Sequence, residues 1–81
     1  MLRRIGLALH YTKLKNLVVK LSQAPPLYIP IYTYTLKKVG ILYDVIGNIE
    51  SPYGLIKPIS IDNNILGQYI YAKDIDLGKK R

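Results

Sequence analysis

Apolar residues occur along the chain in short runs that are rich in β-branched and aromatic side chains and are separated by turn-forming residues. No stretch keeps the 3.6-residue spacing of an amphipathic helix, and strand formers dominate, with twelve isoleucines, four valines and eight tyrosines. The pattern therefore predicts six short strands. They are residues 5–10, 17–21, 31–34, 39–46, 53–57 and 68–72.

The number and spacing of these strands favour a small barrel. Pro25 and Pro26 have no backbone N–H to donate to a sheet, so residues 22–28 are expected to form a loop. Closure would remove the exposed strand edges that promote aggregation. We expect an all-β, six-stranded, closed or nearly closed barrel over residues 5–73, with a basic N-terminal end at residues 1–4 and a basic tail at residues 74–81. No internal repeat is visible.

The fourth predicted strand is apolar on both faces. With strict alternation its side chains form two sets, and neither set is cleanly polar. A domain of 81 residues has little material for a second layer, so a partner protein is expected to cover one face. The two sets are Val39, Ile41, Tyr43 and Val45, and Gly40, Leu42, Asp44 and Ile46.

The net charge of +7 comes mainly from the two ends of the chain. Between residues 5 and 78, seven lysines stand against five acidic residues, a balance of only +2. Basic ends are usually solvated, and they attract RNA weakly and in a salt-sensitive way. Such contact is expected at most through Lys79, Lys80 and Arg81. No apolar run reaches the roughly 18–20 residues of a membrane span, so we expect a cytoplasmic protein that does not bind membrane.

Few residues are suited to catalysis. The chain has no cysteine, which excludes thiolate metal sites, disulfides and cysteine nucleophiles. It has one histidine, His10, which disfavours a zinc site. Among the acids, only Asp74 and Asp76 are close in sequence, and they lie in the charged tail. No serine is in evident register with His10, and no glycine-rich phosphate loop is present. The sequence predicts a protein that is not an enzyme and has no cofactor, metal ion or small-molecule substrate.

Seven of the eight tyrosines fall in the predicted strands or at their ends. A ring there could stack on a base, fill a partner's pocket or replace the absent phenylalanine and tryptophan in the core. We expect both surface and core uses, with Tyr32 or Tyr34 turned partly inward. Base-stacking surfaces carry Lys or Arg between the rings, and residues 31–35 and 39–46 contain none, which favours contact with protein. The seven are Tyr28, Tyr32, Tyr34, Tyr43, Tyr53, Tyr69 and Tyr71.

Residues 39–58 carry the densest conformational constraints. Gly40 and Gly47 permit backbone geometries that other residues resist, and Pro52 stiffens the return of the chain. Asp44, an acid in an apolar strand, is expected to accept a structural hydrogen bond from a backbone amide of a neighbouring loop. A loop fixed in this way loses little entropy on binding, so it is predicted to bind protein. The predicted interface consists of Tyr43, Ile46, Gly47, Asn48, Ile49, Ser51, Pro52 and Tyr53.

The run GILYDVIGNIESPYGLIKP, residues 40–58, resembles the signature of the Gar-type core subunit of box H/ACA ribonucleoproteins. In that family a glycine, an Asp-Val-aromatic-Gly turn, a Pro-Tyr pair and a Lys-Pro end recur. The resemblance extends to IGLALH and NLVV as the first hairpin, PPLYIPIYTYTLKKVG as the middle and ILGQYIYAKD as the closing strand. The chain departs from the family at Ile46, Asn48, Tyr28 and Gly54. Gly54 replaces a branched apolar residue, which predicts a looser strand, and the missing glycine/arginine-rich tails make the chain look archaeal.

The resemblance implies a barrel similar to the second domain of translation elongation factors. It also implies a non-catalytic subunit that docks on the catalytic domain of a TruB-like pseudouridine synthase, within the guide-RNA particle that acts in rRNA processing and ribosome biogenesis. Such a subunit scarcely touches the guide RNA and influences the synthase's thumb loop, aiding placement of the substrate RNA and its release. The implied partner is the synthase, with the guide RNA only an indirect one.

Two other interpretations remain open. One is a small RNA-binding barrel, such as a ribosomal or Sm-like protein, that uses its tyrosines and basic ends. The other, an isolated hydrolase or metal protein, is disfavoured by the lack of a catalytic or ligand set. Titration of the protein against structured RNA at two salt concentrations, and against a synthase, would separate the RNA-binding barrel from the synthase subunit.

Overall fold

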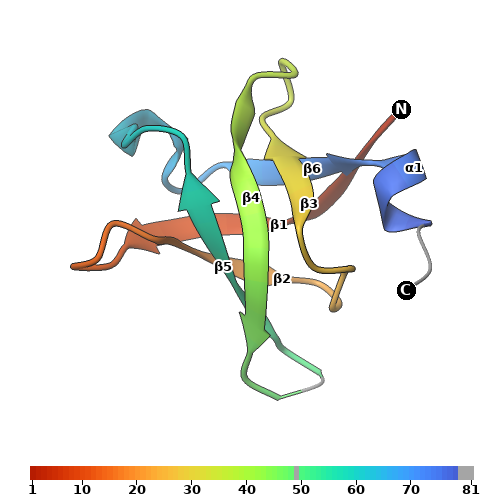
Figure 1. Ribbon diagram of the computed structural model, residues 1–81, viewed down its shortest axis with the longest axis horizontal. Coiled ribbons are helices and arrows are strands. Elements are labelled where there is room, and N and C mark those ends of the chain that lie inside the picture. Colours follow the sequence, from red (N-terminus) through yellow and green to blue (C-terminus); the bar gives the residue numbers. More distant parts are fainter. Residues whose placement is uncertain (49, 79–81) are drawn as a thin grey trace.

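The computed structural model describes residues 1–48 and 50–78, and the strands within them close into a single antiparallel barrel (Figure 1). The elements are β1 (Leu2–Tyr11), β2 (Leu17–Leu21), β3 (Ile29–Tyr32), β4 (Lys38–Ile46), β5 (Tyr53–Pro58), the short 3₁₀ helix η1 (Asn63–Ile65), β6 (Tyr69–Lys73) and α1 (Asp74–Leu77). Around the barrel the strands follow the order β1-β2-β5-β4-β3-β6. The all-β class and the closed six-stranded barrel predicted from the sequence are confirmed.

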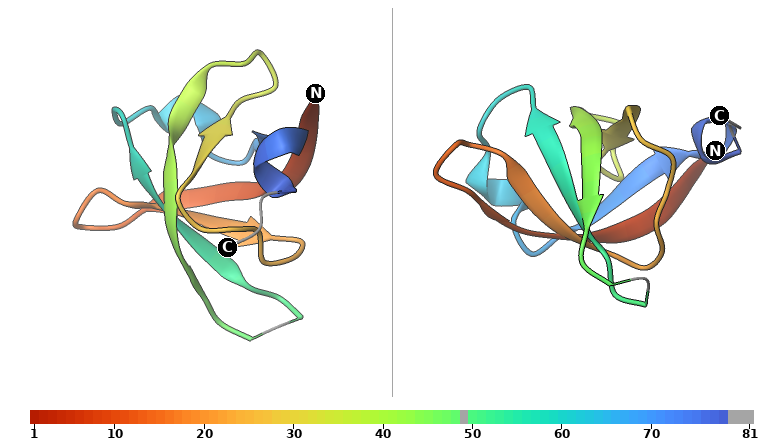
Figure 2. Two further views of the ribbon diagram at one scale, coloured as in Figure 1. Left: turned by 45° about the vertical axis from the view of Figure 1, so that its right-hand side comes forward. Right: turned by 60° about the horizontal axis from the view of Figure 1, so that its bottom comes forward.

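Aliphatic side chains fill the barrel. Apart from the register shifts in β1 and β4, inward positions alternate with outward ones along the strands, and the inward residues of all six strands meet in one cluster. Each large aliphatic side chain buried in this way contributes about 1.5–3 kcal/mol. Leu77 of α1 packs against the cluster, so the short helix covers part of the core. Figure 2 shows this helix beside the N-terminal end of β1. The largest fully buried side chains are Leu17, Val19, Ile29, Ile31, Leu42, Ile56 and Ile70.

The two halves of the chain have the same strand pairing, so the barrel has an approximate internal two-fold symmetry. In β1, one extra residue precedes Gly6 relative to β6 and another follows Ala8 relative to β2; in β4, the same irregularities precede Gly40 relative to β3 and follow Leu42 relative to β5. The two halves are joined by two pairs of equivalent strands, β2 with β5 and β3 with β6. Within them, Val18 pairs with Leu55 and Tyr32 pairs with Tyr71.

This internal repeat was not visible in the sequence because the loops of the two halves differ in length. Equivalent residues lie 34, 37 and 39 positions apart in the three pairs of strands, as in Gly6 and Gly40, Lys20 and Lys57, and Ile31 and Ile70. No single period therefore aligns the halves. Within residues 4–10 and 38–44, only the glycine is identical.

That shared glycine lies where two backbones come very close. A Cβ atom at Gly6 would lie 2.2 Å from the carbonyl oxygen of Lys20, and one at Gly40 would lie 2.2 Å from the carbonyl oxygen of Lys57. Real Cβ atoms do not approach an oxygen this closely, so each position accepts only glycine without a shift of the backbone. Both glycines adjoin a strand irregularity, and bulges of this kind bend a strand so that the sheet can curve into a barrel.

The ends of the domain differ from the prediction. β1 begins at Leu2, so Arg3 and Arg4 are part of the barrel and pair with β6, whereas the sequence placed them in a solvated N-terminal end. Residues 74–77, expected to be tail, form α1. The side chain of Arg3 pairs with the carboxylate of Asp74. The basic residues of the N-terminal end are therefore fixed on the barrel surface.

Strict alternation along the fourth strand was also wrong. Extra residues at Val39 and Tyr43 shift the register of β4 twice, so Val39, Gly40 and Leu42 are all buried. Val45, which follows the second extra residue, Tyr43, also packs against the core. The predicted grouping of Val39, Ile41, Tyr43 and Val45 on one face does not occur, because each bulge exchanges the two faces of the strand.

Gly54 does not loosen β5. The glycine is buried, and a Cβ atom there would lie 2.8 Å from a methyl of Leu42 and 3.0 Å from methyls of Leu21 and Val19. Neighbouring side chains therefore occupy the space that a branched residue would need. The expectation of a looser strand was wrong.

We expect Gly40→Ala to destabilise the protein by about 1–3 kcal/mol or more, because the new methyl group must displace backbone atoms. Urea unfolding followed by circular dichroism measures the loss. Gly78→Ala is the matched control. The nearest atom to the Cβ position of Gly78 is 3.6 Å away and the residue has a φ of −85°, so the urea midpoint of this variant should hardly change. Equal midpoints for the two variants would show that the close approach at Gly40 is not required.

Candidate protein-binding surface

The β4–β5 hairpin is longer than its equivalent in the first half. The pairs Tyr11–Leu17 and Val45–Gly54 occupy equivalent positions, and the chain between them is five residues long in the first hairpin and eight in the second. The tip of β4–β5 consequently projects from the body of the barrel (Figures 1 and 2). The family-like run of residues 40–58 covers β4 from Gly40 onward, this tip and β5. The motif is therefore one continuous structural unit.

Local hydrogen bonds fix the shape of the tip. Gly47 has a φ of +93°, which L-residues other than glycine rarely adopt. The Oδ1 atom of Asn48 accepts a hydrogen bond of 2.8 Å from the backbone N–H of Ser51. At the base, the N–H of Leu21 donates to the carbonyl oxygen of Pro52 over 3.0 Å, which joins the hairpin to the end of β2. The tip is held by its own chain and does not depend on a partner for its turn.

Ile46 and Tyr53 form a cross-strand pair near this tip. Ile46 is 45% exposed, and Tyr53 is exposed to a similar degree, so the pair presents apolar surface to solvent. Adjacent apolar groups on a projecting hairpin are suited to insertion into a partner's pocket. Tyr43, at the bulge, is half-buried. Asp44 Oδ1 accepts a 2.9 Å hydrogen bond from the N–H of Val45, so its predicted structural bond exists within the bulged strand and does not reach a loop.

The predicted interface residues have different positions in this hairpin. Ile46, Gly47, Asn48, Ser51 and Tyr53 are exposed together at its tip. Pro52 is buried and supports the hairpin from beneath, so it offers no surface for contact. Ile49 lies outside the described residues, as do the predicted RNA contacts Lys79, Lys80 and Arg81.

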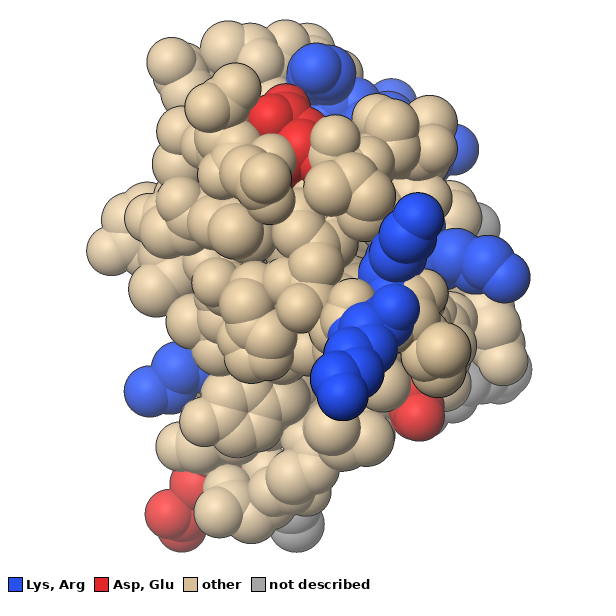
Figure 3. All heavy atoms as spheres, turned by 90° about the vertical axis from the view of Figure 1, so that its left-hand side faces the viewer, with Lys and Arg blue, Asp and Glu red and all other residues tan. Residues whose placement is uncertain are grey.

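A second exposed apolar surface lies at the β1–β2 tip and was not predicted. Leu14, Ile59 and Ile61 line an open hollow of about 270 Å³ beside Pro58. Ile59 is 66% exposed. Figure 3 views the molecule from this side: uncharged atoms cover most of the surface, and the Lys and Arg side chains form separate groups. In the sequence, the two isoleucines that follow Pro58, a residue that ends strands, were the signal that could have identified this surface.

The tyrosines do not serve the core as predicted. In the described part of the chain, Tyr11 is the tyrosine that packs against the core cluster, and its hydroxyl bonds the backbone of Asp62 at 2.9 and 3.1 Å. Tyr32 and Tyr34 both point outward, because Ile31 and Thr33 between and beside them are buried. Tyr32 is half-buried and Tyr34 is exposed, and neither packs against the core cluster, so the core use predicted for one of them is not observed.

The comparisons with known proteins give no family for this chain. It matches no protein-family model, and no curated protein is similar enough in sequence to count as a relative. Among the described residues, no cluster of three or more His, Cys, Asp or Glu side chains could hold a metal ion. In the same part of the chain, no helix is long and apolar enough to cross a membrane.

We expect Asn48→Ala to raise the amide hydrogen-exchange rate of Ser51 by roughly fivefold, since one hydrogen bond contributes about 1 kcal/mol. NMR measures these rates, and the exchange rates of the amides in the β2–β5 ladder should not change. Asn48→Asp keeps an acceptor oxygen at the same place and should retain the protection. If alanine and aspartate behave alike, the side-chain bond does not fix the tip.

Proposed function

We propose that this protein is a non-catalytic subunit of the box H/ACA guide-RNA pseudouridylation particle, located in the cytoplasm of an archaeal cell. In this role it binds the catalytic domain of a TruB-like pseudouridine synthase. The observation that carries the proposal is the segment of residues 40–58, which resembles the family signature and forms the projecting β4–β5 hairpin. The closed barrel, which agrees with the fold that the resemblance implies, supports it further.

The proposed contact is the exposed face of the hairpin tip. Ile46 and Tyr53 supply its apolar centre, and the polar groups of Asn48 and Ser51 lie at its margin. Interfaces commonly have this arrangement of an apolar core and a polar rim. Because local hydrogen bonds already order the turn, docking costs little additional conformational entropy.

The proposed mechanism is a shift of population in the synthase. A subunit without catalytic groups changes a partner's turnover only by binding two of its conformations with different affinity. Binding that favours the state in which the thumb loop is withdrawn from RNA would speed release of the product. Placement of the substrate RNA depends on the same loop, so a single binding event can act on both steps.

Ile46→Asp is expected to weaken binding to the synthase by at least about 30-fold, or about 2 kcal/mol, because an unpaired carboxylate would be buried in an apolar interface. Isothermal titration calorimetry measures the affinity, and a thermal melt confirms that the variant is folded. Ile59→Asp introduces the same charge on the other exposed apolar surface and serves as the matched control. Loss of binding in Ile59→Asp alone would assign the interface to the surface around Leu14 and Ile61.

The protein is expected to accelerate pseudouridine formation more strongly with substrate RNA in excess than with enzyme in excess. Multiple turnover includes product release and loop opening, which often limit the rate, whereas a single turnover reports the chemical step. The measurement compares both regimes with and without the protein. Equal acceleration in the two regimes would contradict control of release and indicate assembly of the active site or placement of the substrate.

A further inference from the structure

A row of two tyrosines flanked by two cations crosses four strands on the outside of the barrel. Lys38 of β4 pairs with Tyr32 of β3, Tyr32 pairs with Tyr71 of β6, and Tyr71 pairs with Arg4 of β1. These side chains point outward, because the neighbouring residues Ile31 and Ile70 are buried. The row reads Lys-Tyr-Tyr-Arg and follows the internal symmetry, with its centre between the two rings.

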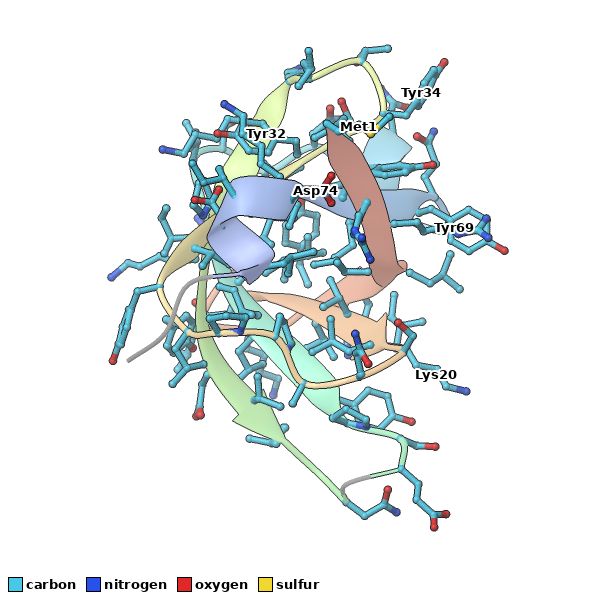
Figure 4. All side chains as sticks on the ribbon, turned by 90° about the vertical axis from the view of Figure 1, so that its right-hand side faces the viewer. Met1, Lys20, Tyr32, Tyr34, Tyr69 and Asp74 are labelled. Carbon is cyan, nitrogen blue, oxygen red and sulfur yellow. The ribbon has the colours of Figure 1, made fainter. Side chains whose placement is uncertain are left out.

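Two further tyrosines extend this row into an aromatic surface. Tyr34 is 70% exposed and Tyr69 is 52% exposed. Together with Tyr71, Gly67 and Gln68 they line an open hollow of about 310 Å³. Gly67 has a φ of +82°, and a Cβ atom there would point into open space. We call the row and these two rings the tyrosine face. Figure 4 shows Tyr32, Tyr34 and Tyr69 in the upper part of the molecule, away from the β4–β5 hairpin at the bottom.

Cations are held directly against the rings of this face. The guanidinium of Arg4 lies 4.3 Å from the centroid of the Tyr69 ring, and Nζ of Lys73 lies 5.1 Å from the centroid of the Tyr32 ring. Within the described residues, neither cation makes an ion pair, and Lys38 makes none either. The nearby acid Asp74 is neutralised by Arg3. The tyrosine face therefore combines exposed π surfaces with positive charge that carboxylates of the described chain do not balance.

The sequence pattern disfavoured this combination because it considered each strand alone. Residues 31–35 carry no Lys or Arg between their tyrosines. The sheet supplies the cations from neighbouring strands, since Lys73, Arg4 and Lys38 come from β6, β1 and β4. Interleaving occurs across the strands and not along them.

We propose that the tyrosine face binds single-stranded nucleic acid, with bases stacked on Tyr34, Tyr69 and Tyr71 and phosphates held by Arg4, Lys38 and Lys73. Aromatic rings that carry stacked bases beside cations that follow the backbone are the two requirements for binding a strand without sequence preference. The inference goes beyond the synthase contact and does not depend on it.

The arrangement fits a nucleic-acid strand better than a protein partner. Protein interfaces are depleted of lysine, whereas on this face Lys38 and Lys73 lie beside the ring of Tyr32. A polyanion with flat bases complements both features at once. A duplex would offer the phosphates but keep its bases stacked inside, so the rings would gain nothing from it.

The test measures binding of fluorescein-labelled dodecauridine RNA and dodecathymidine DNA to the 81-residue chain by fluorescence anisotropy, at two salt concentrations. The double variant Tyr34→Leu/Tyr69→Leu keeps apolar side chains but removes two stacking rings, and it should weaken binding at least about fivefold for each ring. Tyr28→Leu is the matched control, since Tyr28 is 72% exposed and lies outside the face. It should retain the affinity of the unchanged protein. Binding of either oligomer supports the proposal, and the tighter of the two identifies the sugar that the site prefers.

The contribution of the cations is measured separately, from the salt dependence of the affinity. Arg4→Gln should lower the slope of log affinity against log salt concentration by about 0.7, the change expected for one lost phosphate contact to a single strand. Three results would overturn the proposal: no binding of either oligomer at low salt, equal losses in Tyr28→Leu and the double variant, or binding of an RNA duplex as tightly as a single strand. Weaker synthase binding by the double variant, with oligomer binding unchanged, would instead assign the face to a protein interface.

Discussion

Closure of this barrel depends on two places where one backbone passes directly over another. At Gly6 and at Gly40 the space that a Cβ atom would need is occupied by a carbonyl oxygen of the next strand. An irregularity in pairing adjoins each glycine, and together they bend β1 and β4 sharply enough for six short strands to enclose an aliphatic core. Without these bends the sheet would have two free edges and an apolar face open to water. The rest of the structure follows from them, including which side chains reach the outside.

The internal symmetry separates what the fold requires from what it does not. Both halves keep the glycine, the two irregularities and the register, so these are requirements of closure. The β4–β5 tip breaks the symmetry by three additional residues and carries Ile46 and Tyr53 on its surface. Closure does not need this extension, since the equivalent β1–β2 hairpin closes with a shorter one. An extension that the barrel can do without is available for recognition, and this is the physical basis for the proposed binding surface there.

The sequence located all six strands approximately because their signal is local, although β3, predicted at residues 31–34, lies at Ile29–Tyr32. Alternating β-branched residues and proline-containing loops indicate where each strand lies, and residues 17–21 form β2 with the predicted bounds. What depends on pairing between strands could not be predicted. The bulge residues Val39 and Tyr43 cannot be recognised without the partner strand, and the positions of Arg4 and Lys73 beside tyrosines result from the register of β1, β3 and β6. The resemblance located the hairpin motif but contained no information on the tyrosine face.

The separation of the two surfaces has a consequence for how they could work together. The hairpin tip lies at one end of the molecule and the tyrosine face at the other (Figure 4), with the packed core between them. The two surfaces therefore share no residues. Both are built on the same rigid ladder, so a strand held on the tyrosine face would lie at a fixed position relative to a synthase held by the hairpin. If both proposals hold, the protein raises the local concentration of RNA beside its partner, and this effect requires no change in its own conformation.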